Sequence, residues 1–171
     1  MAKLFIQSMP TPEELQTSVS RIHEGVDTGP LYANLLFMKV ASELDNYLDS
    51  VLAPYNLSSG RFTLLHLLSD FPEGLMPSEL SQRVGVTQAT ISGLLNSLEK
   101  AELVKRELHQ KDARSFVIRL TEKGEGLIKE LFPVWSPKLS AFWSQFSDQE
   151  RTLMQGLLEK MLRSTSLLTR N

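Results

Sequence analysis

The strongest constraint on the fold is a pair of short helices joined by a three-residue turn. Residues 77–84, Pro-Ser-Glu-Leu-Ser-Gln-Arg-Val, are typical of a short helix with proline at its first position. Gly85 supplies the positive φ that a tight helix exit needs. Val84-Gly85-Val86 then forms the turn, and Thr87 caps a second helix. The segment 77–100 is therefore predicted to be helix, tight turn, helix.

The second helix has two unlike faces. Its predicted buried face carries apolar residues at i, i+3, i+4 and i+7: Ile91, Leu94, Leu95 and Leu98. Its opposite face carries small or polar residues: Ala89, Gly93, Asn96 and Lys100, flanked by Ser92 and Ser97. Such a face suggests close approach to another surface, such as base edges in a major groove. Packing against another helix is the alternative, since glycine inside a helix costs about 1 kcal/mol and usually has a structural reason.

A β-hairpin with a charged tip follows. We expect strands at Leu103–Leu108 and Ser115–Leu120, joined by a tip that holds His109, Lys111, Asp112 and Arg114. With a helix at Ser59–Ser69 in front, this is the element order of a winged helix-turn-helix. In that geometry Arg114 enters the minor groove, Asp112 holds the arginine or the hairpin, and Lys111 meets phosphate. The alternative is a solvated surface pair that contributes about 0 to 1 kcal/mol.

Helices rich in apolar residues flank this segment. A capping box at Thr11-Pro12-Glu13-Glu14 begins a short helix, and a long amphipathic helix extends from Leu31 to Pro54. Thr121 caps a helix in which Pro133 and Pro137 predict a kink or break, and residues 147–150 begin a last helix. The predicted fold is mainly α with a small β-hairpin wing, that is, a winged helix-turn-helix plus N- and C-terminal dimerisation helices. We divide it into an extension and long dimerisation helix (1–57), a DNA-binding lobe (58–120) and C-terminal dimerisation helices (121–171).

Composition narrows the class of protein. The chain has 171 residues, 42% of them hydrophobic, which is enough to bury a core, and it has no cysteine for disulfides, thiolate metal sites or thiol chemistry. The N-terminus MAKLFIQSMP is too short and too polar for a signal peptide, so we expect a cytoplasmic protein without a membrane segment. The net charge is −2, yet residues 58–120 hold eight Lys and Arg against seven Asp and Glu. A local basic surface is compatible with that balance.

The run ELSQRVGVTQATISGLLNSLEKAELVKRELHQKDARSFVIRLTEKG resembles the MarR family of bacterial transcription regulators. The family's hairpin carries Asp-x-Arg, an alternating strand, Leu-Thr and a glycine, which match Asp112, Arg114, Leu120, Thr121 and Gly124. The resemblance implies a homodimer on a near-palindromic operator, with recognition helices about one helical turn of DNA apart. It departs from the family at Gly93, where members often have arginine.

The resemblance and the motifs together give a set of candidate site residues. Predicted DNA contacts from the recognition helix are Thr87, Gln88, Ala89, Thr90, Ser92, Gly93, Asn96 and Lys100. Predicted contacts from the wing are Lys111, Asp112 and Arg114. The family commonly binds small aromatic or amphipathic effectors, for which Tyr32, Phe37, His66 and Trp135 are the predicted pocket.

The leading functional hypothesis is a sequence-specific DNA-binding transcription regulator, a ligand-responsive repressor that acts as a homodimer. The alternative is a winged-helix protein-interaction module without sequence-specific DNA binding, which Gly93 and the acidic net charge motivate. An enzyme ranks third, because no Ser/His/Asp cluster or nucleotide loop stands out. His23, His66 and His109 lack ligand-type spacing, so we expect no metal and no cofactor.

Overall fold

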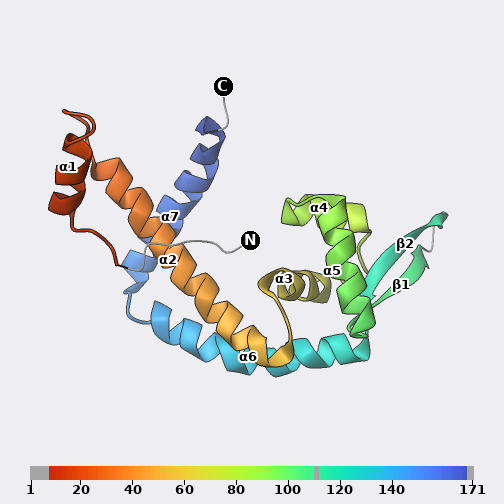
Figure 1. Ribbon diagram of the computed structural model, residues 1–171. Helices are drawn as coiled ribbons and strands as arrows, with labels where there is room; N and C mark the ends of the chain where they lie inside the picture. Colours follow the sequence, from red (N-terminus) through yellow and green to blue (C-terminus); the bar gives the residue numbers. More distant parts are fainter. Residues whose placement is uncertain (1–7, 110–111, 169–171) are drawn as a thin grey trace.

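The computed structural model describes residues 8–109 and 112–168, without the side chains at 109 and 112–114. The element order is α1 (Pro12–Ser20), α2 (Gly29–Leu52), η1 (Ala53–Tyr55), α3 (Ser59–Ser69), α4 (Pro77–Val84), α5 (Gln88–Lys100), β1 (Val104–His109), β2 (Asp112–Leu120), α6 (Glu122–Trp143), α7 (Asp148–Ser164) and η2 (Thr165–Leu167). The mainly helical winged helix-turn-helix fold is confirmed. In Figure 1, α3, α4, α5 and the hairpin form a lobe on one side, and α1, α2 and α7 form an arm on the other.

Local capping signals begin the helices where the sequence predicted. Thr11, Thr87, Thr121 and Ser147 are N-caps, and each side chain accepts a hydrogen bond from a backbone N–H in the first turn of its helix. The turn between α4 and α5 has Gly85 at φ 72°, the left-handed conformation that glycine adopts without strain. Ser81 Oγ donates to Val86 O at 2.6 Å and closes this turn. These contacts fix the angle at which α5 leaves α4.

The main core lies inside the lobe. It is formed by side chains that are almost completely buried, among them Leu64 and Leu65 of α3, Leu80 of α4, Ile91, Leu95 and Leu98 of α5, and Ile118 of β2. Leu94 is only half-buried, although its spacing predicted the core. The buried side of α5 packs against three other elements, and the opposite side therefore faces outward.

The hairpin is longer than predicted. β1 and β2 pair antiparallel from Val104↔Leu120 to Leu108↔Phe116, with a bulge before His109↔Asp112. The prediction began the second strand at Ser115, because it assigned the tip with Asp112 and Arg114 to the turn, whereas the backbone of β2 begins at Asp112. Leu75 adds a short bridge to Ile118 and ties the α3–α4 connection to the hairpin.

Helix α6 connects the lobe to the arm. Its first turn packs against the hairpin, its middle packs on α3 and α2, and its last turn meets α7. A break near Pro133 and Pro137 was predicted, and that part of the prediction is wrong because α6 continues through both prolines. Figure 1 shows the helix curved along its length, which is how an α-helix accommodates the lost backbone donors.

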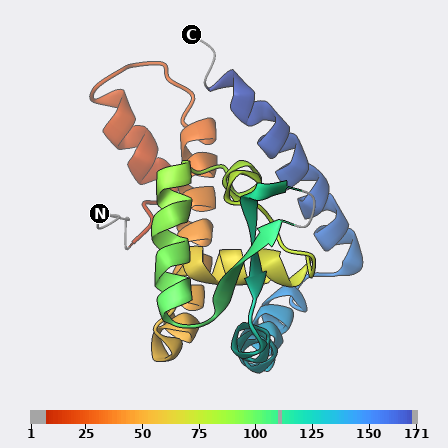
Figure 2. The ribbon, with the colours of Figure 1, turned by 90° about the vertical axis from the view of Figure 1, so that its right-hand side faces the viewer.

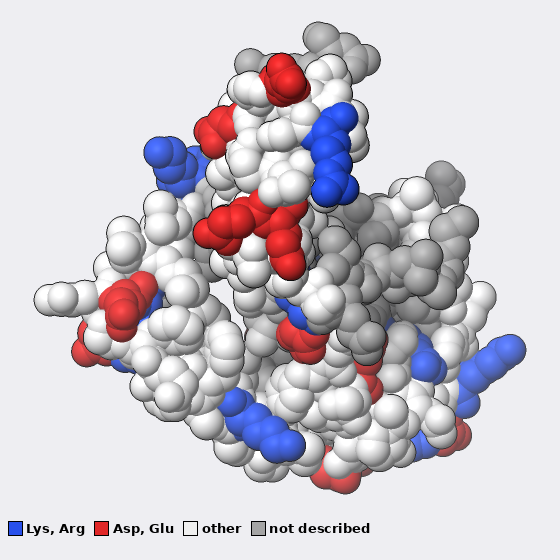
Figure 3. Space-filling model, turned by 60° about the vertical axis from the view of Figure 1, so that its left-hand side comes forward, with Lys and Arg blue, Asp and Glu red and all other residues white. Residues whose placement is uncertain are grey.

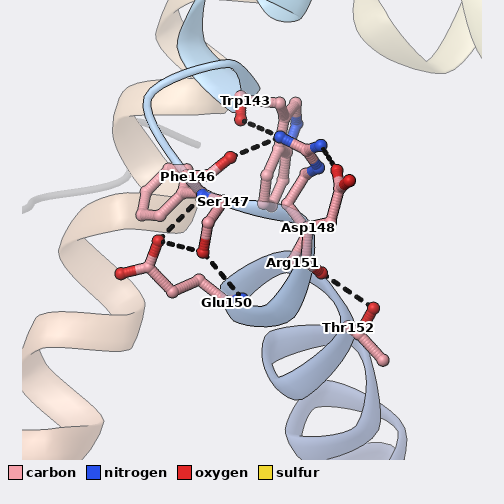
Figure 4. Close-up of polar contacts among 7 residues, drawn as sticks. All are labelled: Trp143, Phe146, Ser147, Asp148, Glu150, Arg151 and Thr152. Carbon is pink, nitrogen blue, oxygen red and sulfur yellow. Dashed lines mark hydrogen bonds and ion pairs between the residues drawn. The ribbon is translucent and has the colours of Figure 1, made fainter.

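An arginine holds the corner between α6 and α7 (Figure 4). Arg151 donates to the carbonyl oxygens of Trp143, at 3.2 Å, and of Phe146, and it pairs with Asp148. The rings of Phe142, Trp143 and Phe146 contact one another with centroids 5.3 to 5.8 Å apart. The corner thus has its backbone acceptors satisfied and an aromatic cluster beneath it.

Candidate nucleic-acid interface

The outward face of α5 is the first component of the candidate interface. All eight predicted recognition-helix residues are exposed, namely Thr87, Gln88, Ala89, Thr90, Ser92, Gly93, Asn96 and Lys100. A Cβ placed on Gly93 would meet no atom within 4 Å. Packing against another helix of this chain therefore does not explain the small residue, and the surface at Gly93 is open to a separate molecule. Figure 2 shows α5 and the hairpin side by side on the face turned toward the viewer.

The first turn of α5 begins with an N-cap and a polar residue at its first helical position. Thr87 Oγ1 accepts from Thr90 N at 3.2 Å and lies 3.0 Å from Thr90 Oγ1. Gln88 stands at the first helical position, where the helix dipole favours an anionic group such as phosphate. The exposed face therefore begins with polar side chains, Thr87, Gln88 and Thr90, and continues with small ones.

The hairpin is the second component. Its backbone lies beside α5, and β1 contacts that helix directly. Lys111 lies outside the described residues, and so do the side chains of Asp112 and Arg114, whose backbone belongs to β2. The contacts predicted for the wing therefore stay predictions.

A network of arginines braces α5, and sequence reasoning missed it. Arg106 of β1 donates to Glu99 Oε1 at 2.8 Å and to Asn96 Oδ1 at 3.0 Å. Arg61 of α3 donates to Ser97 Oγ at 3.2 Å. These pairs join different elements, at separations of 7 and 10 residues for Arg106 and 36 residues for Arg61. Alternation along β1 was the one sequence signal that Arg106 points toward the helix.

The base of the hairpin is also held by ion pairs. Arg119 Nη2 lies 3.1 Å from Glu73 Oε2, and Arg119 Nε lies 3.3 Å from Glu107 Oε2. Lys105 Nζ contacts Glu107 Oε1 at 2.7 Å, and this hydrogen bond is the main cause that lowers the pKa of Glu107. These pairs tie the hairpin to the loop before α4. They contain two positive and two negative side chains, Lys105 and Arg119 with Glu107 and Glu73.

The predicted effector residues fall into two groups. Both His66 and Trp135 contact the ring of Phe62, with centroid distances of 6.0 and 6.3 Å. Tyr32 and Phe37 lie on the first half of α2, where Phe37 is exposed. A cavity of about 460 Å³ between α3, the hairpin and α6 is lined by other residues, including Phe71, Lys105 and Ile128. None of the four residues lines this cavity, and their role as a pocket stays a prediction.

Within residues 8–109 and 112–168, no cluster of three or more His, Cys, Asp or Glu is arranged to hold a metal ion. No helix in the same ranges has the length and apolar character to cross a membrane.

Known proteins resemble this chain in sequence. A model described as the MarR family matches residues 55–115. The HTH-type transcriptional repressor YetL of Bacillus subtilis is 30% identical over 152 residues, which is 88% of this chain and 91% of YetL. The transcriptional repressor MprA of Escherichia coli K12 is 27% identical over 154 residues, which is 90% of this chain and 87% of MprA.

Solved structures resemble it in fold. The crystal structure of the S. aureus MepR–DNA complex has a TM-score of 0.70 at 26% identity, covering 77% of this chain and 96% of that chain. A mutant of MarR from E. coli, complexed with operator DNA, also has a TM-score of 0.70, at 20% identity over 79% of this chain and 96% of that chain. The second match shows a shared fold.

Proposed function

This chain belongs to the MarR family, and on that premise we propose that it is a sequence-specific DNA-binding transcription regulator that acts as a homodimeric repressor. The observation that carries the proposal is the outward face of α5, which is exposed, small and polar, and open at Gly93. A helix with such a face fits into a major groove, where base edges need short donors and acceptors at close range. The names of YetL and MprA support the repressor role.

We assign the DNA contacts to two elements. Gln88, Ser92 and Asn96 of α5 read base edges, and Lys100 at the end of the helix contacts phosphate. Arg114 at the hairpin tip enters the adjacent minor groove, with Lys111 on the backbone and Asp112 as its orienting partner. Residues 58–120 are then the DNA-binding lobe.

The dimer is proposed from the apolar surface of the arm and of α6. Large hydrophobic side chains that stay exposed are concentrated on α2, α6 and α7, for example Leu36, Phe132, Leu153 and Leu157. Among the described residues of the 58–120 lobe, only Leu108 belongs to this class. Figure 3, which turns the left-hand side of Figure 1 forward, shows broad areas without charge between scattered charged residues.

Such a surface fits a second copy of the chain. Monomeric soluble proteins rarely expose contiguous apolar patches above a few hundred Å², and a stable interface buries about 800 Å² on each partner. A two-fold axis brings the same patch of both subunits together and sets the distance between the two copies of α5. Segments 1–57 and 121–171 are the dimerisation regions in this proposal.

The proposed regulation is by a small aromatic or amphipathic effector. To change DNA binding, the effector must bind one spacing of the α5 helices more tightly than the other. The candidate residues are Tyr32 and Phe37 of α2, His66 of α3 and Trp135 of α6. The proposal includes no enzymatic activity and no cofactor, and it places the protein in the cytoplasm with its DNA.

A salt titration tests the proposed function. The purified chain is titrated with DNA from upstream of its own gene and with shuffled DNA of the same length, at several salt concentrations. We expect preference for the upstream DNA and a binding constant that falls with salt by a log–log slope of about 0.9 per phosphate contact. Lys100→Gln should make that slope shallower while the preference remains. Equal binding of both DNAs at moderate salt would instead favour a protein-interaction module.

A further inference from the structure

The side chain of Asn96 is held by a guanidinium that reaches it from the hairpin. Arg106 donates Nη2 to Asn96 Oδ1 at 3.0 Å and Nε to Glu99 Oε1 at 2.8 Å. The same guanidinium lies over the ring of Phe116, with Cζ 4.9 Å from the ring centroid. Arg106 is thus fixed by an amide, a carboxylate and an aromatic ring, and it in turn fixes Asn96.

This contact determines which amide atom faces the hairpin. A guanidinium carries only N–H donors, so the atom that Arg106 contacts must be the amide oxygen. Asn96 Nδ2 then has two donor hydrogens, for which the structure gives no acceptor among the described side chains and backbone. Because Asn96 is exposed on the outward face of α5, those donors are available to a bound molecule.

We propose that Asn96 acts as a hydrogen-bond donor that reads an acceptor edge, guanine N7 or O6 or thymine O4, with Arg106 as its positioning residue. This inference rests on the proposed DNA-binding function. An unrestrained asparagine recognises adenine with both halves of its amide, accepting from N6 and donating to N7. In this chain Arg106 already uses one lone pair of the amide oxygen and fixes the plane of the amide, and charge-assisted hydrogen bonds are about twice as strong as neutral ones. Adenine N7 can still accept from Nδ2, but the two-bond adenine pair is weakened, whereas guanine offers two acceptors, N7 and O6, to the same donor.

Glu99 restricts Arg106 to this positioning role. An arginine beside a recognition helix would ordinarily contact phosphate. Here the carboxylate of Glu99 pairs with the guanidinium, and about a third of each side chain is exposed. Arg106 therefore influences DNA through the orientation of Asn96.

Arg61 provides a matched control for the charge. It donates to Ser97 Oγ at 3.2 Å and to Ser58 Oγ at 3.3 Å, so it reaches α5 one residue beyond Asn96. Removing its charge leaves the contact between Arg106 and Asn96 in place. Arg61→Gln and Arg106→Gln each remove one positive charge near the same helix, and only the second releases Asn96.

The test is selection of bound sequences from a random duplex library with the full chain and its variants. We expect the wild type to enrich guanine or thymine at one position of each half-site, and Asn96→Ala to weaken that preference by about three- to tenfold. Arg106→Gln should shift the same position toward adenine. Arg61→Gln should weaken binding evenly and leave every base preference unchanged.

Two results would overturn the inference. One is adenine enriched by the wild type at the position that responds to Asn96→Ala, and the other is an unchanged preference there in a folded Arg106→Gln protein. Thermal unfolding checks the fold of each variant. Glu99→Gln, which removes the charge that holds Arg106 without altering Asn96, should also shift the preference toward adenine. A wild type that enriches no sequence would contradict the DNA-binding proposal itself, and so the two failures are distinguishable.

Discussion

Replacing Gly124 by alanine should destabilise the chain, although the same change at an ordinary helical glycine stabilises. Gly124 lies in the first turn of α6 and is buried against the chain that precedes the hairpin. A Cβ at this position would lie 2.1 Å from Leu103 O. That oxygen accepts a hydrogen bond from Thr121 N at 3.1 Å, and Thr121 Oγ1 donates to Glu102 O at 2.6 Å. The contact therefore sits at the joint between the lobe and α6.

The expected magnitude follows from this geometry. Bringing the new carbon to an ordinary contact distance of 3.4 Å requires a shift of about 1.3 Å between α6 and Leu103. Forcing an extra methyl group into a packed site costs about 1 to 3 kcal/mol, and weakening the Thr121 hydrogen bond costs about 1 kcal/mol more. Alanine recovers about 0.5 to 1 kcal/mol through its helix propensity. The free energy of unfolding should therefore fall by about 1 to 3.5 kcal/mol.

Urea denaturation followed by circular dichroism at one fixed protein concentration measures this change. Gly126→Ala is the matched control, because a Cβ at Gly126 meets nothing within 4 Å in the same helix. That variant should be more stable than the wild type by about 0.5 to 1 kcal/mol. A Gly124→Ala protein with a urea midpoint at or above that of the wild type would refute the reasoning.

Three further predictions concern the dimer, the wing and α7. Leu157→Glu on α7 should shift the chain toward monomer, as measured by light scattering after size exclusion. Leu108→Glu on the hairpin is the control and should not change the mass. Both leucines are more than half exposed in the single chain. Arg114→Ala should weaken operator binding with little change in the unfolding midpoint, and wild-type affinity would remove the wing from the proposed interface. Hydrogen bonds from Ser147 lower the pKa of Glu150, so its capping contribution is present above the usual carboxyl pKa and is lost as pH falls through the lowered value. Glu150→Gln should accordingly flatten the acid side of the stability curve, and an unchanged acid transition would exclude this cap as a source of it.

Helix starts were predictable from the sequence because their causes are local. The side chains of Thr11, Thr87, Thr121 and Ser147 bond to backbone only three residues away, and the sequence contains both partners. Gly85 was predictable for the same reason, since a left-handed helix exit selects glycine. Local chemistry thus placed the turn that presents α5.

Cross-element contacts were not predictable. Arg106 meets Asn96 and Glu99 only because the hairpin folds back beside α5, and nothing in the spacing of ten and seven residues specifies that return. The start of β2 depended on cross-strand pairing in the same way. The proposed effector residues came from the resemblance to the family, and the structure places two of them, His66 and Trp135, against Phe62.

The continuity of α6 has a mechanical consequence. Its 22 residues, at about 1.5 Å each, give a helix about 33 Å long. The aromatic corner with α7 lies at one end, and Gly124, which contacts the lobe, lies at the other. If α6 rotates by about 10° at the aromatic corner, its Gly124 end moves by about 6 Å over that length. In the proposed dimer, a small rotation at this corner would therefore change the distance between the two copies of α5.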